Sequence, residues 1–237
     1  MLTMLALALV NISTLRLVKI KASGRESILL TAYTAVVNFF GPLQSGPAAR
    51  AVYLKRRYSV DLKKYSVATL VYYFFWAAFS GIFLLSGLLK WWLIPLLAIC
   101  VTLLYLLSKH EFIKNKMRLL DLKAWYLLAL ATFAQISIIT VIYFIELHSV
   151  TPATHFSQAI IYTGAANFAL FVSITPGALG FRETFLVFSK HLHHISNSSI
   201  IAANIIDRSV YLIVLIILAL IIVLTHASKY LGMKSEK

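Results

Sequence analysis

Long apolar runs, separated by short polar segments, make up most of this chain. A helix needs about 20 apolar residues to cross the hydrocarbon core of a bilayer. Four runs come close to that length or exceed it, and they predict crossing helices at 66–89, 91–108, 124–145 and 200–225. A shorter run at 2–15 predicts a first helix that is brief for a crossing. The pattern therefore predicts an all-α polytopic integral membrane protein.

Two further apolar regions are broken by Gly and Pro. Residues 28–40 and 48–54 flank the sequence GPLQSGP, while residues 156–174 and 181–188 flank TPGALG. A helix of about 14 residues is roughly 21 Å long, short of a bilayer core of ~30 Å. We therefore expect each region to form a re-entrant helical hairpin. The helix breaks are expected at Gly41, Pro42, Gly46, Pro47, Pro176, Gly177 and Gly180.

The composition excludes a soluble globular protein and gives the charges a topological meaning. Of the 237 residues, 60% are hydrophobic and 13% are charged, with a mean hydropathy of +0.85. The 22 Lys and Arg outnumber the 8 Asp and Glu, and most lie in four segments: four in 16–26, six in 50–65, five in 109–123 and three after residue 226. Basic residues gather in cytoplasmic loops, so we expect these loops and the C-terminus in the cytoplasm. There they would contact anionic lipid rather than nucleic acid.

This sidedness makes the two hairpins enter the membrane from opposite sides. Residues 146–156 lack Lys and Arg and are expected outside the cytoplasm. The half 1–108 then consists of a crossing helix, a hairpin and helices, and the half 124–225 of a crossing helix, a hairpin and a helix. We infer an inverted repeat within a single domain, residues 1–237, of about six to eight membrane segments in the cell membrane. Paired, interrupted segments point to a transport site, although Pro and Gly also kink ordinary membrane helices.

Four charged residues fall within or beside the predicted membrane segments: Arg182, Glu183, Asp207 and Arg208. An isolated charge there costs about 2.5–3.5 kcal/mol on insertion scales. Adjacent residues point about 100° apart on a helix, so Arg182 cannot form a good ion pair with Glu183, nor Asp207 with Arg208. We predict cross-pairs of Glu183 with Arg208 and of Arg182 with Asp207, which a substrate could open. The alternative is a permanent buried salt bridge that holds two helices together.

Arg50 is a fifth candidate, because it follows the first break at the start of the return arm. A helix N-terminus attracts anions, and the guanidinium fork suits a phosphate. In the alternative interpretation, Arg50 is an interfacial residue that continues into Lys55, Arg56 and Arg57, which gain about 1 kcal/mol each near anionic lipid.

Other features carry less chemistry. The run KHLHH, with Lys190, His191, His193 and His194, predicts a polar cap at the outer surface, since no acidic or Cys partner for a metal lies nearby in sequence. No Walker loop, dinucleotide-binding turn, HExxH motif or nucleophile elbow occurs. We therefore expect no metal, no cofactor and no ATP-driven pump.

Two stretches resemble the lysylphosphatidylglycerol synthase transmembrane region family. NFFGPLQSGPAARAVYLKRRYSV is similar to the family's Pro/Gly break before RAYLL-type residues, and SITPGALGFRETFLVF to its PGGLGxRE segment. Asp207 and Arg208 fall where a polar pair commonly interrupts the family's last helices. Gln44 and Pro47 stand where the family usually has Arg and Glu. The resemblance implies a flippase-like domain. Larger relatives add a soluble aminoacyl-transfer domain, and we expect no synthase activity from this chain.

These features together favour ATP-independent movement of a phospholipid or lipid-linked amphiphile between leaflets. Arg50 and Arg208 would meet phosphate, while Glu183 and Asp207 would meet a cationic headgroup or balance the arginines. One alternative is a membrane enzyme that acts on a lipid headgroup, with Glu183 or Asp207 as general base. Another is a scaffold that binds a partner through its basic loops.

Overall fold

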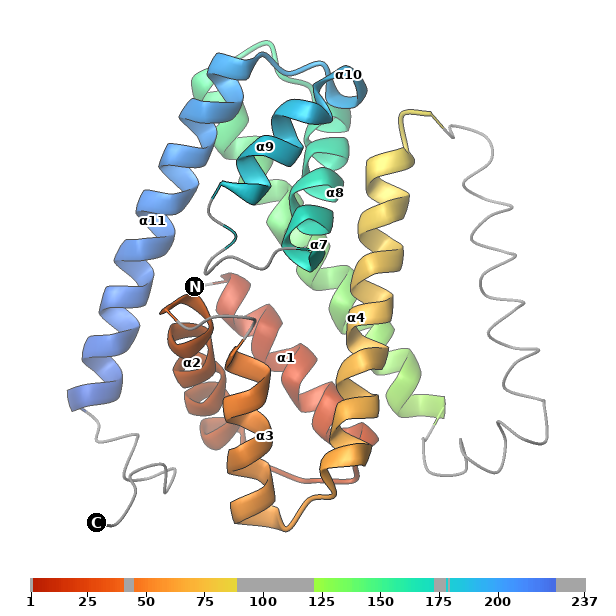
Figure 1. The fold of residues 1–237 in the computed structure, drawn as a ribbon, viewed down its shortest axis with the longest axis vertical. Helices are drawn as coiled ribbons and strands as arrows, with labels where there is room; N and C mark the ends of the chain where they lie inside the picture. The colour runs from red at the N-terminus through yellow and green to blue at the C-terminus, as the bar shows by residue number, and fades with distance from the viewer. Residues whose placement is uncertain (1, 41–44, 89–121, 173–177, 179, 225–237) are drawn as a thin grey trace.

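A computed structural model of the protein describes residues 2–40, 45–88, 122–172, 178 and 180–224 (Figure 1). Within these residues the chain forms helices and no β-strand, which confirms the all-α prediction. The helices are α1 (Leu2–Leu17), α2 (Gly24–Phe40), α3 (Ser45–Tyr58), α4 (Leu62–Leu85), α7 (Leu122–Val150), α8 (Phe156–Val172), α9 (Phe181–Phe188), α10 (Lys190–His193) and α11 (Asn197–Leu224).

Three of these helices, α4, α7 and α11, are long and apolar enough to cross a membrane. They confirm the crossings predicted at 66–89, 124–145 and 200–225, and at 24 to 29 residues each exceeds a core of ~30 Å at about 1.5 Å per residue. Helix α1 is apolar but shorter, as predicted. The crossing predicted at 91–108 lies outside the described residues.

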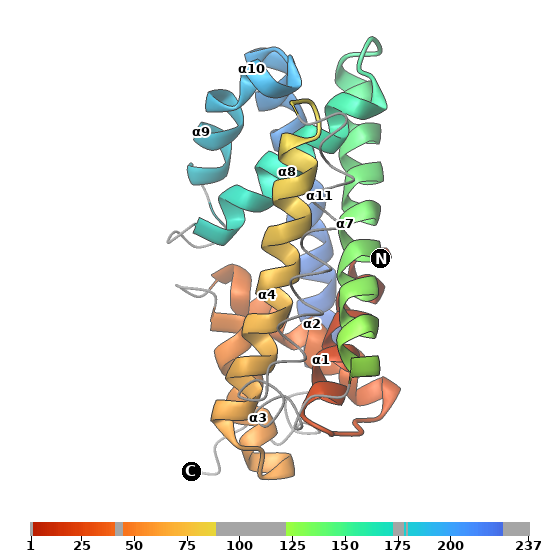
Figure 2. The ribbon, with the colours of Figure 1, turned by 90° about the vertical axis from the view of Figure 1, so that its right-hand side faces the viewer.

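Two antiparallel pairs of shorter helices point toward each other from opposite ends of the molecule. We call α2 with α3 hairpin 1, and α8 with α9 hairpin 2. Helix α1 ends, α2 begins and α3 ends at the same end of the molecule (Figure 1). We call it the basic end, because the sequence places Lys19 just after α1, Arg25 at the start of α2 and Arg57 at the end of α3. Hairpin 2 opens at the other end. In both views α2 and α8 finish, and α3 and α9 begin, near the middle of the long axis (Figures 1 and 2). This is the arrangement expected of two re-entrant hairpins.

The helix breaks differ in part from the prediction. Gly46 and Pro47 were expected in the break but lie in the first turn of α3, where proline is tolerated because the first helical N–H groups have no intrahelical partner. A Cβ on Gly46 would lie 2.6 Å from the carbonyl oxygen of Thr34, so glycine lets α3 approach α2 closely. Gly180 does end a break, as the residue before α9. Gly41, Pro42, Pro176 and Gly177 lie outside the described residues.

The helix contacts have the symmetry of an inverted repeat. Replacing α1, α2, α3 and α4 by α7, α8, α9 and α11 converts each contact pair of the first half into one of the second: α1–α2 into α7–α8, α2–α3 into α8–α9, α3–α4 into α9–α11 and α1–α4 into α7–α11. Two contacts between the halves are related in the same way, because the exchange converts the contact of α4 with α8 into that of α11 with α2. The opposite directions of the hairpins give the repeat its inverted sense (Figure 1).

Buried apolar clusters hold each half together. One cluster joins α7, α8, α9 and α11 around Tyr162 and Leu186. Another joins α1, α2, α3 and α4 around Leu54 and Tyr65. A third joins α1, α4 and α7 between them. Helix α8 contributes fully buried alanines, whose small side chains permit close helix packing in membranes. By contrast, α11 exposes many large apolar side chains, as a lipid-facing helix does.

Candidate functional site

The first turn of α9 positions two of the predicted charges. Gly180 precedes the helix with a φ of 78°, a left-handed conformation that favours glycine. The backbone N–H of Gly180 donates to Oε2 of Glu183 at 2.8 Å, and Thr184 Oγ1 donates to the Gly180 carbonyl at 2.7 Å. A carboxylate at this position stabilises a helix N-terminus. The sequence GFRET thus fixes Glu183 and its neighbour Arg182 at the inner end of hairpin 2.

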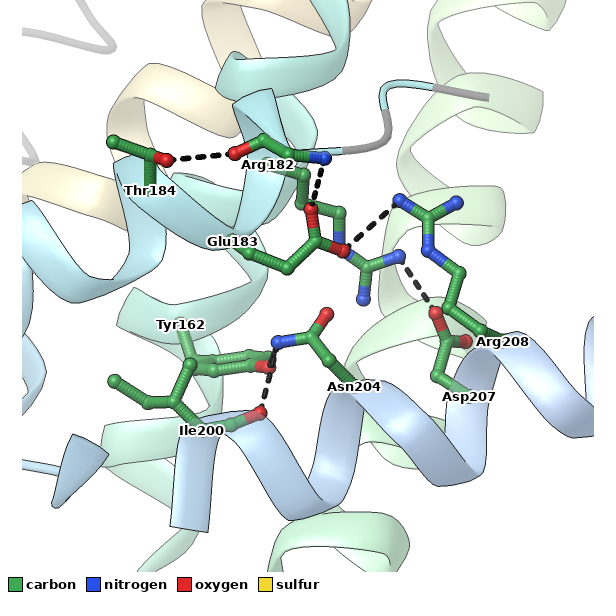
Figure 3. A network of polar contacts seen from close by, with 9 residues as sticks. Tyr162, Arg182, Glu183, Thr184, Ile200, Asn204, Asp207 and Arg208 are labelled. Carbon is green, nitrogen blue, oxygen red and sulfur yellow. Dashed lines mark hydrogen bonds and ion pairs between the residues drawn. The ribbon is translucent and has the colours of Figure 1, made fainter. Parts of the chain in front are cut away.

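Both charges of α9 pair with α11, as the sequence predicted. Arg182 Nη1 lies 2.6 Å from Asp207 Oδ2, and Arg208 Nη2 lies 3.3 Å from Glu183 Oε1 (Figure 3). Each pair joins residues 25 positions apart. The two predicted cross-pairs are confirmed, and they connect hairpin 2 to the last crossing helix.

The two ion pairs differ in burial. The side chain of Arg182 is 4% exposed and that of Asp207 20%, whereas Arg208 is 19% and Glu183 32% exposed. The guanidinium of Arg182 also lies over the ring of Tyr143 in α7, 5.1 Å from its centroid, a favourable cation–π contact. The Arg182–Asp207 pair is therefore the short inner one, and the Glu183–Arg208 pair is the longer outer one.

The outer pair lines a groove of about 280 Å³ between α9 and α11. Glu183, Asn204, Arg208 and Ser209 supply its polar groups. Its remaining lining is apolar and consists of Val187, Ile200, Ile201 and Ile205. Ile201 and Ile205 are exposed on the apolar surface of α11, so the groove combines a charged part with walls that face lipid. This combination fits an amphiphile.

Asn204 belongs to this site, although the sequence analysis did not single it out. It lies one turn before Arg208 and is buried, and its Nδ2 donates to Tyr162 Oη at 3.1 Å and to the Ile200 carbonyl at 2.9 Å. The signal was the spacing of Asn204, Asp207 and Arg208, which at i, i+3 and i+4 share one face of an apolar helix.

Arg50 lies in hairpin 1, where its contacts are with α1 and α2 rather than with α9 or α11. Its guanidinium donates to Asn11 Oδ1 and, at 2.7 Å, to Thr34 Oγ1. Among the described residues these hydrogen-bond partners are neutral, and neither was predicted. The structure thus brings together four of the five candidate residues and leaves Arg50 as a separate cation in the other hairpin.

His193, expected in a polar cap, is the last residue of α10 and is fully buried. Its Nε2 lies 3.0 Å from the Leu186 carbonyl, and its Nδ1 accepts from Ile195 N–H at 3.2 Å, which is the bonding of a neutral imidazole. Burial lowers the pKa of His193 below its ordinary value. Within the described part of the chain, no group of three or more His, Cys, Asp or Glu could hold a metal ion.

The comparison with known families agrees with this architecture. The family model described as the lysylphosphatidylglycerol synthase TM region matches residues 1–219. The chain belongs to this family. No curated protein and no solved structure matched the chain.

Membership of the lysylphosphatidylglycerol synthase TM region family makes the chain a membrane domain, in agreement with its three crossing helices. The match extends over both hairpins and includes all five candidate charges. The family assignment therefore covers the whole proposed site, while the chemistry of that site has to be argued from its own residues.

Proposed function

We propose that this protein moves a phospholipid or lipid-linked amphiphile between membrane leaflets without ATP. The observation that carries the proposal is the Glu183–Arg208 pair, which lies in a groove with apolar walls and is partly exposed. A headgroup would occupy the charged part of the groove while the acyl chains stay in lipid. Family membership supports a membrane role of this kind.

Loading would exchange ionic partners. Arg208 would turn from Glu183 to the phosphate of the headgroup, and its guanidinium suits this role because it offers several donors in a fixed plane. Glu183 keeps the Gly180 N–H as a partner when Arg208 leaves, so its carboxylate stays compensated. It could then accept a cationic group of the lipid. The inner pair, Arg182 with Asp207, would stay closed and hold α9 on α11 throughout.

Arg50 would provide an anion contact in the opposite half. Its hydrogen bonds to Asn11 and Thr34 orient the guanidinium without neutralising it. A phosphate that passes the middle of the membrane would therefore meet a positive charge in either hairpin. We place the basic end in the cytoplasm of the cell, because basic residues concentrate there and would contact anionic lipid.

Leaflet exchange in reconstituted vesicles tests the proposal. Vesicles of phosphatidylethanolamine and phosphatidylglycerol carry a fluorescent phospholipid, and a membrane-impermeant quencher reports the fraction in the outer leaflet. We expect Glu183→Gln and Arg208→Gln each to lower the exchange rate by roughly tenfold or more, which corresponds to about 1.4 kcal/mol. Arg56→Gln, a change at an exposed arginine of α3, is the matched control and should exchange like the wild type.

Full exchange activity in both groove variants would contradict the proposal. Chemical conversion of the labelled lipid without leaflet exchange would instead indicate a membrane enzyme. Insertion of each variant is checked by its recovery in the vesicles, so that loss of exchange reports on the groove rather than on yield.

A further inference from the structure

One buried acceptor in the groove has no donor. Asn204 is 3% exposed, yet it lines the groove beside Glu183 and Arg208. Among the residues that the structure describes, nothing hydrogen-bonds its Oδ1. A buried polar group without a partner costs about 1–3 kcal/mol. Because Asn204 lines the groove, a ligand bound there could supply the donor that this buried atom lacks.

The amide of Asn204 can take only one orientation. Its nitrogen donates to the Ile200 carbonyl, a group that only accepts, and to the hydroxyl of Tyr162. Turning the amide over would place two acceptor oxygens against each other. The amide oxygen therefore points the other way, toward Glu183 and Arg182 (Figure 3).

The polar groups of the groove require a ligand that both accepts and donates. Arg208 offers donors to an anion. In the empty groove the carboxylate oxygens of Glu183 accept from Gly180 N–H and from Arg208, whereas Asn204 Oδ1 has no donor among the described residues. When Arg208 turns to a phosphate, Glu183 can meet the positive charge of a headgroup, and Asn204 Oδ1 is the neutral acceptor that requires an N–H or O–H. A phosphate next to an ammonium or a hydroxyl satisfies both requirements. A choline headgroup satisfies only the first, because its quaternary ammonium has no N–H or O–H.

We propose that Asn204 is a specificity-determining residue of the groove, which selects lipids whose headgroup carries a hydrogen-bond donor beside the phosphate. This inference rests on the proposed function, because it takes the groove to be the headgroup site. The competing occupant is a water molecule that bridges Asn204 Oδ1 and Arg182 Nη2, which also has no partner among the described residues. A water would leave lipid selectivity unaffected by Asn204.

Binding of short-chain lipids to the purified full chain in detergent tests the assignment. The probes are dihexanoyl phosphatidylethanolamine, phosphatidylglycerol and phosphatidylcholine, which share a phosphate and differ in headgroup donors. For the wild type we expect the first two to bind roughly 3- to 10-fold more tightly than the third, the value of about one net hydrogen bond. In Asn204→Ala the three affinities should converge near that of the choline lipid. Arg56→Gln, at an exposed arginine of α3 outside the groove, should keep the preference.

Equal affinities in the wild type, or a preference that persists in Asn204→Ala, would overturn the assignment. The wild-type comparison needs no variant, so it decides the matter even if Asn204→Ala does not fold. The result is also separable from the proposed function. Selective binding without leaflet exchange would refute transport and leave Asn204 as a headgroup contact, whereas exchange without selective binding would refute only the role of Asn204.

Discussion

Hairpin 1 and hairpin 2 are both antiparallel helix pairs, but their second helices, α3 and α9, bind different kinds of partner. The partners of Arg50 in α3 are neutral, whereas those of Arg182 and Glu183 in α9 are charged. In hairpin 1, Arg50 donates to the neutral side chains of Asn11 and Thr34. In hairpin 2, Arg182 and Glu183 pair with opposite charges on α11. Among the described residues Arg50 has no ionic partner to give up, whereas Arg208 would have to leave Glu183 to bind a phosphate. The exchange of ionic partners that we propose would therefore take place at hairpin 2.

The two hairpins also differ in what they are fastened to. The two arms of hairpin 1 bind each other: Ser45 Oγ donates to the Val37 carbonyl at 2.8 Å, and at the basic end Tyr58 Oη donates to Glu26 at 2.7 Å. Hairpin 1 is attached to α1 through the neutral side chain of Asn11. The ion pairs of α9, in contrast, reach α11, so the position of α9 depends on charges that another helix supplies.

The largest expected effect comes from removing the inner counter-ion of hairpin 2. Asp207→Leu leaves the guanidinium of Arg182 buried without its ionic partner, and we expect the free energy of unfolding to fall by about 3–5 kcal/mol. Chemical unfolding in detergent measures the change. Glu183→Leu, in the outer pair, should cost less than half as much, because Arg208 is more exposed. Equal losses for the two variants would mean that the inner pair has no special structural role.

Hairpin 1 should respond to shape rather than to charge. In Gly46→Ala the new Cβ would lie 2.6 Å from the Thr34 carbonyl oxygen and 2.8 Å from Asn38 Cβ, so the two arms must separate. We expect a loss of about 1–3 kcal/mol, as for other overpacked sites. Gly81→Ala in α4 is the control, because its Cβ would meet nothing within 4 Å. If both alanines left the unfolding free energy unchanged, close contact between α2 and α3 would not stabilise the hairpin.

A smaller effect should appear at the open end of hairpin 2 on acidification. The pKa of His193 is lowered by burial, so below the ordinary value of about 6.5 the unfolded chain binds a proton that the folded protein excludes. Stability is thus complete above that pH and falls as the pH drops through it. Melting temperatures across this range measure the loss. His193→Gln should flatten the dependence, whereas His191→Gln, at an exposed histidine, should leave it as in the wild type.

Two kinds of feature could be predicted from the sequence: the helices, from the lengths of the apolar runs, and the ion pairs, from the cost of an unpaired charge in a membrane. The predicted run 181–188 is the helix α9 that the structure shows, because Pro176, Gly177 and Gly180 interrupt the apolar pattern before it. The ion pairs were predictable because adjacent charges on a helix diverge, so Glu183 and Asp207 had to find their partners on other segments. These arguments use only periodicity and the cost of an unpaired charge in a membrane.

Hydrogen bonds that involve neutral side chains could not be predicted in this way. Asn11 and Thr34 carry no charge that demands a partner, so their bonds to Arg50 depend on how α1, α2 and α3 pack. The same holds for the amide of Asn204. His193 was expected at the surface because it stands among polar residues, yet it is buried, and its ring nitrogens bond the Leu186 carbonyl and the Ile195 N–H. Side-chain direction in short helices is decided by tertiary packing rather than by local sequence.

The most direct test of the central claim, that the Glu183–Arg208 pair opens to admit a headgroup, is leaflet exchange by a protein in which the two charges are swapped. Glu183→Arg combined with Arg208→Glu keeps an ion pair between α9 and α11, so its free energy of unfolding should exceed that of the single variant Arg208→Glu. The phosphate-binding guanidinium, however, moves from α11 to α9. We predict that exchange in the swapped protein stays roughly tenfold or more below the wild-type rate. Wild-type exchange in the swapped protein would contradict the account, because the pair would then serve only to hold the two helices together.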